Sequence, residues 1–198
     1  MYLLVETIKI LNGNPQNLIW HQKRFEHSYE SQFGKPPGIK LEKILVIPDQ
    51  FTAGRIKARF LYNRESFTVE FQEYIPAKVR SLKIIYNDYI EYDHKFTDRS
   101  AITKMMKEKG DCDDILIVKK GKITDSSIAN IVFFDGEKWL TPELPLLKGT
   151  TWERLLQGTR IFLQDIKVEN LRLFSHFRLI NSMLDFEEQE MLEISCIK

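Results

Sequence analysis

The sequence predicts an α+β protein, because helical and strand-like segments both occur without the regular alternation of a parallel α/β fold. Residues 14–33 have the apolar spacing of a helix, and a hairpin is expected over residues 55–74. Further on, the Lys-Gly pair at 120–121 and the Asp-Gly pair at 135–136 are turn signals between apolar segments. Two tight hairpins in succession indicate an antiparallel meander. No internal repeat or low-complexity run interrupts the chain.

The first half is expected to begin with a strand over residues 2–10, which alternate in polarity and are rich in β-branched side chains. Asn14 is a candidate helix cap, and Pro15 suits the first helical position of a helix that ends near Phe33. Residues 41–47 fit either a short helix or a strand. Three strands are expected next, at residues 55–62, 66–74 and 82–86.

The second half is expected to open with a helix that Asp98 caps and Gly110 ends. Strands are predicted at residues 115–118, 131–134, 139–140 and 160–168, with a further helix over 151–157. Residues 177–184 form another apolar stretch. A boundary near residue 90 separates these two patterns. The expected domains are therefore a small α+β domain over residues 1–90 and a larger domain over residues 91–198.

Composition excludes several classes of function. Hydrophobic residues make up 43% of the chain and charged residues 29%, with a formal net charge of +1, so a nucleic-acid partner is not expected. Cys112 and Cys196 lie far apart in sequence, which argues against a disulfide framework or a zinc site. The N-terminus lacks the features of a signal peptide, and no apolar run reaches membrane-spanning length. The sequence thus indicates a cytoplasmic protein with no metal and no membrane partner.

Four segments carry candidate chemistry: residues 21–24, 95–99, 124–130 and 147–151. Each has an ordinary structural explanation when taken alone, such as a solvated helix residue, a surface lysine, a turn or a helix cap. Together, in this order and spacing, they resemble the fold-type IV pyridoxal-phosphate enzymes, the family of class IV aminotransferases and aminodeoxychorismate lyases. The most specific match is residues 121–133, Gly-Lys-Ile-Thr-Asp-Ser-Ser-Ile-Ala-Asn-Ile-Val-Phe.

This resemblance implies an architecture and a cofactor. Family members have a small α+β domain followed by a larger pseudo-barrel domain, and they bind pyridoxal 5'-phosphate between the two. They are usually homodimers, so a homodimer is expected here. Because a fold does not establish a function, the residues themselves must carry the chemistry.

The resemblance also implies roles for individual residues. Lys95 matches the lysine that binds the cofactor covalently, and Arg24 matches the arginine that binds its phosphate through a rigid donor fork. The turn at Gly149 matches the phosphate cradle, where hydroxyls and helix N-terminal amides donate to an anion. The further cofactor-binding candidates are Asp125 beside the pyridine nitrogen, Thr150 and Thr151 in the cradle, and Asn181 and Ser182 near the phosphate.

Two residues depart from the family pattern. Asp125 stands where the aminotransferases usually have a glutamate, which is one methylene longer. Trp152 stands where the cradle motif normally has an arginine, which leaves the phosphate to Arg24 and to backbone donors. Arg99 could lower the pKa of Lys95 if it faces the same site, or it could be an ordinary first-turn helix residue.

The spacing of Lys95 and Arg99 is similar to that of aminodeoxychorismate lyases, and the chain is short for an aminotransferase of this family. The resemblance therefore favours a lyase that releases pyruvate from an amine substrate and forms 4-aminobenzoate for folate synthesis. One alternative is an aminotransferase acting on a branched-chain or D-amino acid. Another is a degenerate member without turnover, which the departures at Asp125 and Trp152 would support. Glu6, His94, Tyr92 and Lys104 are expected to be structural or surface residues.

Overall fold

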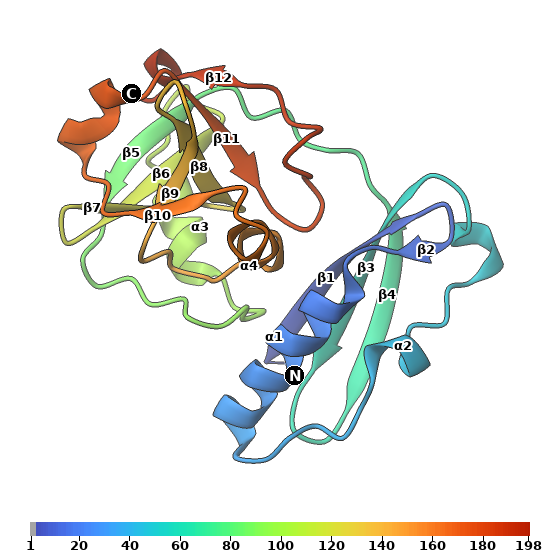
Figure 1. Cartoon of the computed structure of the whole chain (residues 1–198). Coiled ribbons are helices and arrows are strands. Elements are labelled where there is room, and N and C mark those ends of the chain that lie inside the picture. The colour runs from blue at the N-terminus through green and yellow to red at the C-terminus, as the bar shows by residue number, and fades with distance from the viewer. Residues whose placement is uncertain (1–2) are drawn as a thin grey trace. The chain divides into compact units, whose positions relative to one another are not determined.

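The computed structural model describes residues 3–198 and shows two compact units (Figure 1). Of the described residues, unit 1 contains 3–76 together with 94–98. Unit 2 contains residues 77–93 and 99–198. Each unit is organised around its own β-sheet and its own hydrophobic core.

Unit 1 is a four-stranded sheet in the order β2-β1-β3-β4, with helix α1 (Leu18–Phe33) on one face. The strands are β1 (Leu4–Leu11), β2 (Asn14–Pro15), β3 (Arg55–Tyr62) and β4 (Phe67–Glu73). Strands β1 and β3 pair antiparallel along their full length, and β3 and β4 form the expected hairpin. The core lies between the sheet and α1, where Phe25 packs edge-on against Phe60 and Tyr62.

The start of α1 corrects one expectation. Asn14 does not cap the helix, because Asn14 and Pro15 pair with Leu11 and Ile10 as the short strand β2. The helix instead begins after Asn17, which has a left-handed backbone with φ of 54° and makes no side-chain cap. The strand predicted at residues 2–10 is observed as β1, which begins at Leu4, and Tyr2 lies outside the described residues. The undecided segment at residues 41–47 contains a short helix, α2 (Leu41–Ile44), followed by a 3-10 turn η1 (Asp49–Phe51).

Unit 2 contains an eight-stranded sheet in which β8 also pairs with β11. Its strands are β5 (Leu82–Tyr86), β6 (Asp114–Lys119), β7 (Lys122–Ser126), β8 (Asn130–Phe134), β9 (Trp139–Pro142), β10 (Phe162–Gln164), β11 (His176–Ile180) and β12 (Leu192–Glu193). Its helices are α3 (Ser100–Met106) and α4 (Thr150–Gln157), with 3-10 turns η2 (Val168–Leu173) and η3 (Ile194–Cys196). Lys120 and Gly121 both have positive φ at the β6–β7 turn, as the Lys-Gly signal predicts.

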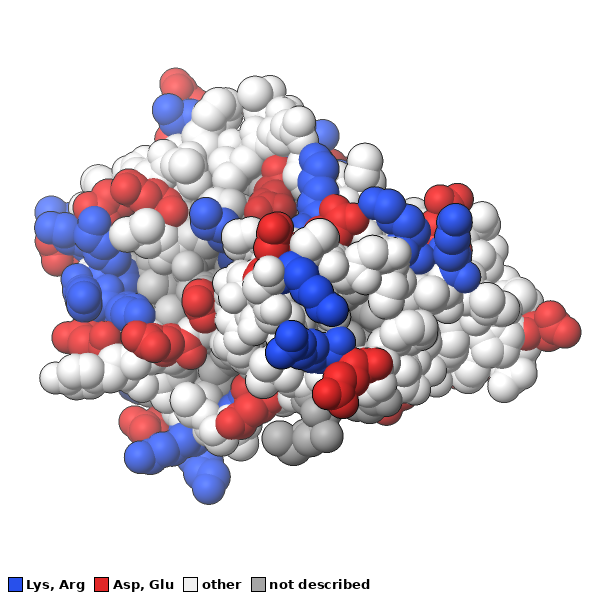
Figure 2. All heavy atoms as spheres, turned by 90° about the horizontal axis from the view of Figure 1, so that it is seen from below, with Lys and Arg blue, Asp and Glu red and all other residues white. Residues whose placement is uncertain are grey.

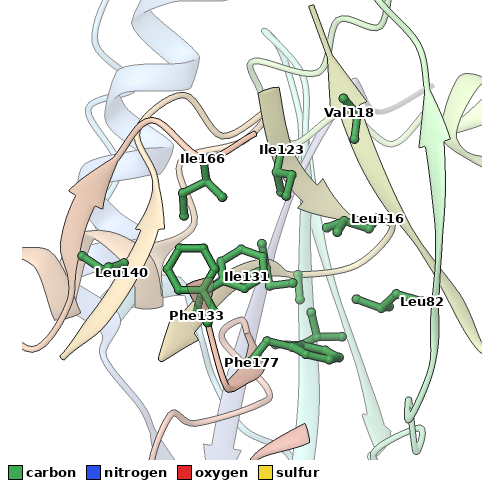
Figure 3. Packing of buried hydrophobic residues seen from close by; sticks show 12 residues of the cluster. Leu82, Leu116, Val118, Ile123, Ile131, Phe133, Leu140, Ile166 and Phe177 are labelled. Atoms are coloured by element: carbon green, nitrogen blue, oxygen red, sulfur yellow. The ribbon is translucent and has the colours of Figure 1, made fainter. Parts of the chain in front are cut away.

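The sheet of unit 2 curls into a pseudo-barrel that the C-terminal segment closes. Ile194 donates its amide hydrogen to the Ser175 carbonyl beside β11, and Lys198 donates to the Leu82 carbonyl on β5. Figure 3 shows apolar side chains from six strands and the adjoining loop meeting inside this curled sheet. Leu82, Leu116, Ile131, Phe133 and Phe177 are all fully buried there. Burial of each such side chain stabilises the fold by roughly 1.5–3 kcal/mol.

The predicted fold class is confirmed: an α+β unit is followed by a larger pseudo-barrel unit. The ranges of the two units differ from the division expected at residue 90 in two places. Strand β5 belongs to unit 2, because it pairs in parallel with β6. Residues 94–98 return to unit 1, because Phe96 forms a β-bridge with Leu4 on β1.

The molecular face drawn in Figure 2 carries basic and acidic side chains interspersed, in keeping with the balanced charge of the sequence. No helix in residues 3–198 combines the length and the apolar character that crossing a membrane requires.

Candidate active site

Unit 1 contains a buried cluster of charged side chains centred on Glu6. Glu6 lies on β1 and is 1% exposed, on the same sheet face as Leu4 and Ile8, which pack against α1. Its carboxylate receives hydrogen bonds from two residues one helical turn apart on α1. Arg24 donates through Nε to Oε1 at 2.9 Å and through Nη2 to Oε2 at 2.7 Å, and His21 Nδ1 lies 2.6 Å from Oε2.

The cluster has a defined charge state at neutral pH. Burial alone would raise the pKa of Glu6, but the Arg24 charge and the hydrogen bonds from His21 and Arg24 outweigh it and lower that pKa to about 2. Burial lowers the pKa of His21, and the charges of Arg24 and Lys95 lower it further against the opposing effect of Glu6. Glu6 is therefore ionised and His21 neutral, so His21 donates its Nδ1 hydrogen to the carboxylate.

Lys95 belongs to the same unit as this cluster. Its carbonyl accepts the Val5 amide hydrogen at 3.0 Å, so the segment that carries Lys95 is bound to the edge of β1. The Lys95 charge is close enough to lower the pKa of His21, which places its amine in the electrostatic field of the cluster. The structure thus brings together two of the predicted site residues, Arg24 and Lys95, in unit 1.

His94 anchors the Lys95 segment to α1. It is 6% exposed, and its two ring nitrogens lie 3.3 Å from the Ser28 hydroxyl and 3.1 Å from the Ser31 hydroxyl. Of the two expectations for Glu6 and His94, a surface position is excluded, because both side chains are buried. The signal for Glu6 was present in the sequence, because strand alternation places it on the same face as Leu4 and Ile8.

Unit 2 holds the other predicted site residues, beginning with Asp125 on β7. This carboxylate is 5% exposed and opposite Asn130 in the β7–β8 pair. Asn130 Nδ2 donates to Asp125 Oδ1 at 2.7 Å and to the Leu147 carbonyl at 2.8 Å, while the Leu147 amide donates to Asp125 Oδ2 at 3.0 Å. Burial raises the pKa of Asp125 to about 7 in spite of these bonds, because amide donors do not neutralise the charge.

The predicted phosphate cradle is the start of helix α4. Gly149 is its N-cap residue and has no side chain with which to cap it, and Thr150 and Thr151 occupy the buried first turn. The first amides of a helix lack partners within the helix and favour an anion. A Cβ added at Gly149 would lie 2.1 Å from Asn130 Oδ1, so the cradle and the Asp125 network are packed directly together.

This close packing predicts a cost for Gly149→Ala. The methyl group would displace Asn130, and so break its bonds to Asp125 and Leu147, which lowers the free energy of unfolding by about 2 kcal/mol. Gly158→Ala, at the other end of α4, is the matched control, because its nearest atom is the Arg154 carbonyl oxygen at 3.3 Å. Urea unfolding of both variants measures the difference, and equal midpoints would contradict the predicted coupling.

Trp152 takes a structural place in unit 2. Its indole is 5% exposed, packs with Leu155 and Ile180, and donates to Thr141 Oγ1 at 2.9 Å. The tryptophan therefore replaces the family's arginine with a core contact. The assignment of the phosphate to Arg24 and to backbone donors stays a prediction.

Arg99 and Asn181 hold the loop that follows Asp125 within unit 2. Arg99 Nη2 donates to the Ser127 carbonyl, and Asn181 Nδ2 donates to the Ile128 carbonyl at 3.0 Å. Asn181 Oδ1 also accepts the amide hydrogens of the two residues after Ser182, so its side chain is occupied by the turn. These contacts give Arg99 and Asn181 a positioning role for the loop, and the predicted cofactor contacts of Asn181 and Ser182 stay predictions.

The residues fit a phosphorylated cofactor with a cationic ring and an aldehyde. Within unit 1, Arg24 suits a phosphate and Lys95 an aldehyde. Within unit 2, the uncapped start of α4 suits an anion. Asp125 is a buried carboxylate whose hydrogen-bond donors are amides, so a ring N–H⁺ beside it would supply charge compensation.

The family model for class IV aminotransferases matches residues 3–187. This chain belongs to the class IV aminotransferase family. Members of this family use pyridoxal phosphate. An uncharacterized protein from Haemophilus influenzae is 38% identical to this family member over 185 residues, which cover 92% of this chain and 98% of that protein.

Solved structures of the family have the same fold as this class IV chain. A "putative 4-amino-4-deoxychorismate lyase" from Haemophilus somnus 129pt superposes with a TM-score of 0.89 at 33% identity, covering 94% of this chain and 98% of that one. A "putative amino-acid aminotransferase" from Mesorhizobium loti superposes with a TM-score of 0.82 at 20% identity, covering 100% and 99%. A hypothetical aminotransferase from Mycobacterium tuberculosis, solved with α-ketoglutarate and PMP bound, superposes with a TM-score of 0.79 at 17% identity, covering 96% and 80%.

Proposed function

We propose that this protein is a pyridoxal-phosphate-dependent lyase that eliminates pyruvate from 4-amino-4-deoxychorismate and leaves 4-aminobenzoate. The observation that carries the proposal is the likeness to the Haemophilus somnus protein, which extends over nearly the whole of both chains at 33% identity. The pairing of Lys95 with Arg99 four residues later also favours a lyase of this family. The use of the product in folate synthesis, which the family resemblance implies, is part of the proposal.

Lys95 would attach the cofactor through its amine, and Arg24 with Thr150, Thr151 and the first amides of α4 would bind the phosphate. When bound, pyridoxal phosphate supplies an electron sink for the carbon that bears the substrate amine. Ionised Asp125 would hold the ring nitrogen in its protonated form. The expected homodimer and cytoplasmic location stay predictions.

In the reaction, the substrate amine would first take the place of Lys95 on the cofactor, and the freed amine of Lys95 would then remove the proton from the ring carbon that bears the substrate nitrogen. The electron pair of that C–H bond would form the new ring double bond as the C–O bond to the enolpyruvyl group breaks, and the ring would become aromatic. Lys95 would then return the proton to the departing group, which leaves as pyruvate. The atoms of the substrate are thus divided between 4-aminobenzoate and pyruvate with no added reactant.

The proposal is tested by incubating the purified protein, loaded with pyridoxal phosphate, with 4-amino-4-deoxychorismate. Equal amounts of pyruvate and 4-aminobenzoate are expected. Conversion of branched-chain or D-amino acids to oxo acids, without pyruvate from the chorismate derivative, would instead support an aminotransferase. Failure to retain or rebind the cofactor would support a degenerate member without turnover.

A further inference from the structure

We propose that Glu6 is a positioning residue that fixes the guanidinium of Arg24 for the cofactor phosphate. The inference rests on the proposed function, because it concerns the side chain assigned to that phosphate. Glu6 would make no direct contact with the cofactor and would act through Arg24.

Burial makes Glu6 costly unless its partners compensate the charge. A carboxylate that is 1% exposed loses its hydration, and the desolvation penalty of an ion in a protein interior is several kcal/mol. An apolar residue would fill this position between Leu4 and Ile8 at lower cost, since both neighbours on the sheet face are fully buried. Buried ion pairs often add little net stability, so a role in fixing Arg24 accounts for Glu6 better than stability does.

The contact geometry fixes the orientation of the guanidinium. Arg24 uses the edge formed by Nε and Nη2, and both nitrogens donate to one carboxylate at 2.9 and 2.7 Å. Two parallel bonds define the plane of the guanidinium, whereas a single bond leaves it free to rotate. The plane in turn determines the directions in which the remaining N–H groups point.

His21 fixes the carboxylate itself. Oε2 of Glu6 receives both His21 Nδ1 and Arg24 Nη2, so the carboxylate is held from two positions on α1. Arg59 and Glu70 in the same sheet form an ion pair that is more exposed to solvent. That pair also has a 2.7 Å contact, but its side chains are 38% and 53% exposed, so solvent competes with it.

Glu6 has two opposing effects on a bound phosphate. Their sum decides whether Glu6→Gln raises or lowers the dissociation constant for pyridoxal phosphate. Its negative charge repels the phosphate, while its hold on Arg24 places a donor fork in advance of binding. If positioning dominates, Glu6→Gln weakens phosphate binding. The glutamine amide group offers only one acceptor oxygen, so Arg24 would keep one of its two bonds. Neutral His21 could then accept a hydrogen bond from the new NH₂ group.

The test compares pyridoxal phosphate with pyridoxal, which lacks the phosphate, by titrating the full chain after its cofactor has been removed. In Glu6→Gln the dissociation constant for pyridoxal phosphate is expected to rise about tenfold. Binding of pyridoxal is expected to change less than about twofold, because Lys95 is intact. Glu70→Gln is the matched control, and it removes an exposed partner of Arg59 without any change in either constant.

A double-mutant cycle separates positioning from a general loss of structure. With Arg24→Gln already present, adding Glu6→Gln should no longer change the ratio of the two dissociation constants. If Glu6→Gln does not fold, Glu6→Asp decides, since aspartate keeps the charge but is one methylene too short to hold Arg24 in the same place. Weaker binding of pyridoxal phosphate but not of pyridoxal in Glu6→Asp supports the proposal, and unchanged binding of both overturns it.

Glu6→Gln binding pyridoxal phosphate as tightly as the wild type, or more tightly, overturns the positioning role while leaving the proposed function standing. Absence of pyridoxal-phosphate binding by the wild type would instead remove the proposed function itself.

Discussion

Replacing Lys95 with alanine is expected to lower the rate of pyruvate release by at least about a thousandfold. The substitution removes both the amine that would attach the cofactor and the base that would move the substrate proton. Lys95→Arg should be equally inactive, because a guanidinium keeps the charge but stays protonated at neutral pH. The effect is measured as kcat for product release under saturating cofactor.

Lys104 supplies the matched control for this prediction. It is an exposed lysine near the end of α3, and Lys104→Ala should retain the wild-type rate within about twofold. A Lys95→Ala protein that folds and still releases pyruvate at a tenth of the wild-type rate would show that another residue moves the proton.

The second large effect is expected for Asp125→Asn, with a decrease in kcat of about a hundredfold to a thousandfold. The asparagine keeps the shape of the side chain but cannot offer a negative charge to the ring nitrogen. Asp165→Asn serves as the control, because Asp165 pairs with Lys122 at 2.9 Å on an exposed part of unit 2. Full activity of Asp125→Asn would show that the ring nitrogen is protonated without this carboxylate.

The pKa of Asp125 adds a dependence on pH that does not require turnover. Without the cofactor its pKa is about 7, above the ordinary 3.8, so the folded state holds the proton more tightly than the unfolded state does. This contribution to stability is complete below about pH 4 and is lost as the pH rises to about 7. Asparagine does not titrate, so Asp125→Asn should not show this decrease in the free energy of unfolding. The difference in that free energy between the variant and the wild type should therefore shift in favour of the variant by roughly 3 kcal/mol from pH 4 to pH 8.

Binding of the cofactor, whose protonated ring nitrogen is a cation, should change this dependence of stability on pH. If a protonated ring nitrogen lies beside Asp125, the carboxylate is stabilised and its pKa falls. Thermal unfolding of the wild type with pyridoxal phosphate should therefore lack the decline between pH 4 and pH 7. A decline that is the same with and without cofactor would place the ring nitrogen elsewhere.

Much of the fold could be predicted from local sequence signals. Apolar alternation predicted β1 and β3, and the turn pairs at 120–121 and 135–136 predicted the meander of unit 2. Long-range pairing could not be predicted in this way. Nothing local in residues 82–86 shows that this strand pairs with β6 rather than with the first sheet, and nothing local in Asn14 shows that it pairs with Leu11.

The candidate site could be predicted in part, through the resemblance of ordered motifs. Lys95, Arg24 and Asp125 are candidates because they match positions at which the family has functional residues. The contacts that orient them were not found, because they depend on which side chains meet across elements. Glu6 reaches Arg24 from 18 residues away in sequence, and Asp125 meets Leu147 across 22 residues.

Whether Lys95 carries pyridoxal phosphate is tested most directly by reducing the loaded protein with borohydride. Peptide mass spectrometry then locates the modified residue. A single modified lysine is expected, at residue 95, together with loss of the visible absorption band. A reduced adduct on any other lysine, or no adduct on a protein saturated with the cofactor, would contradict it.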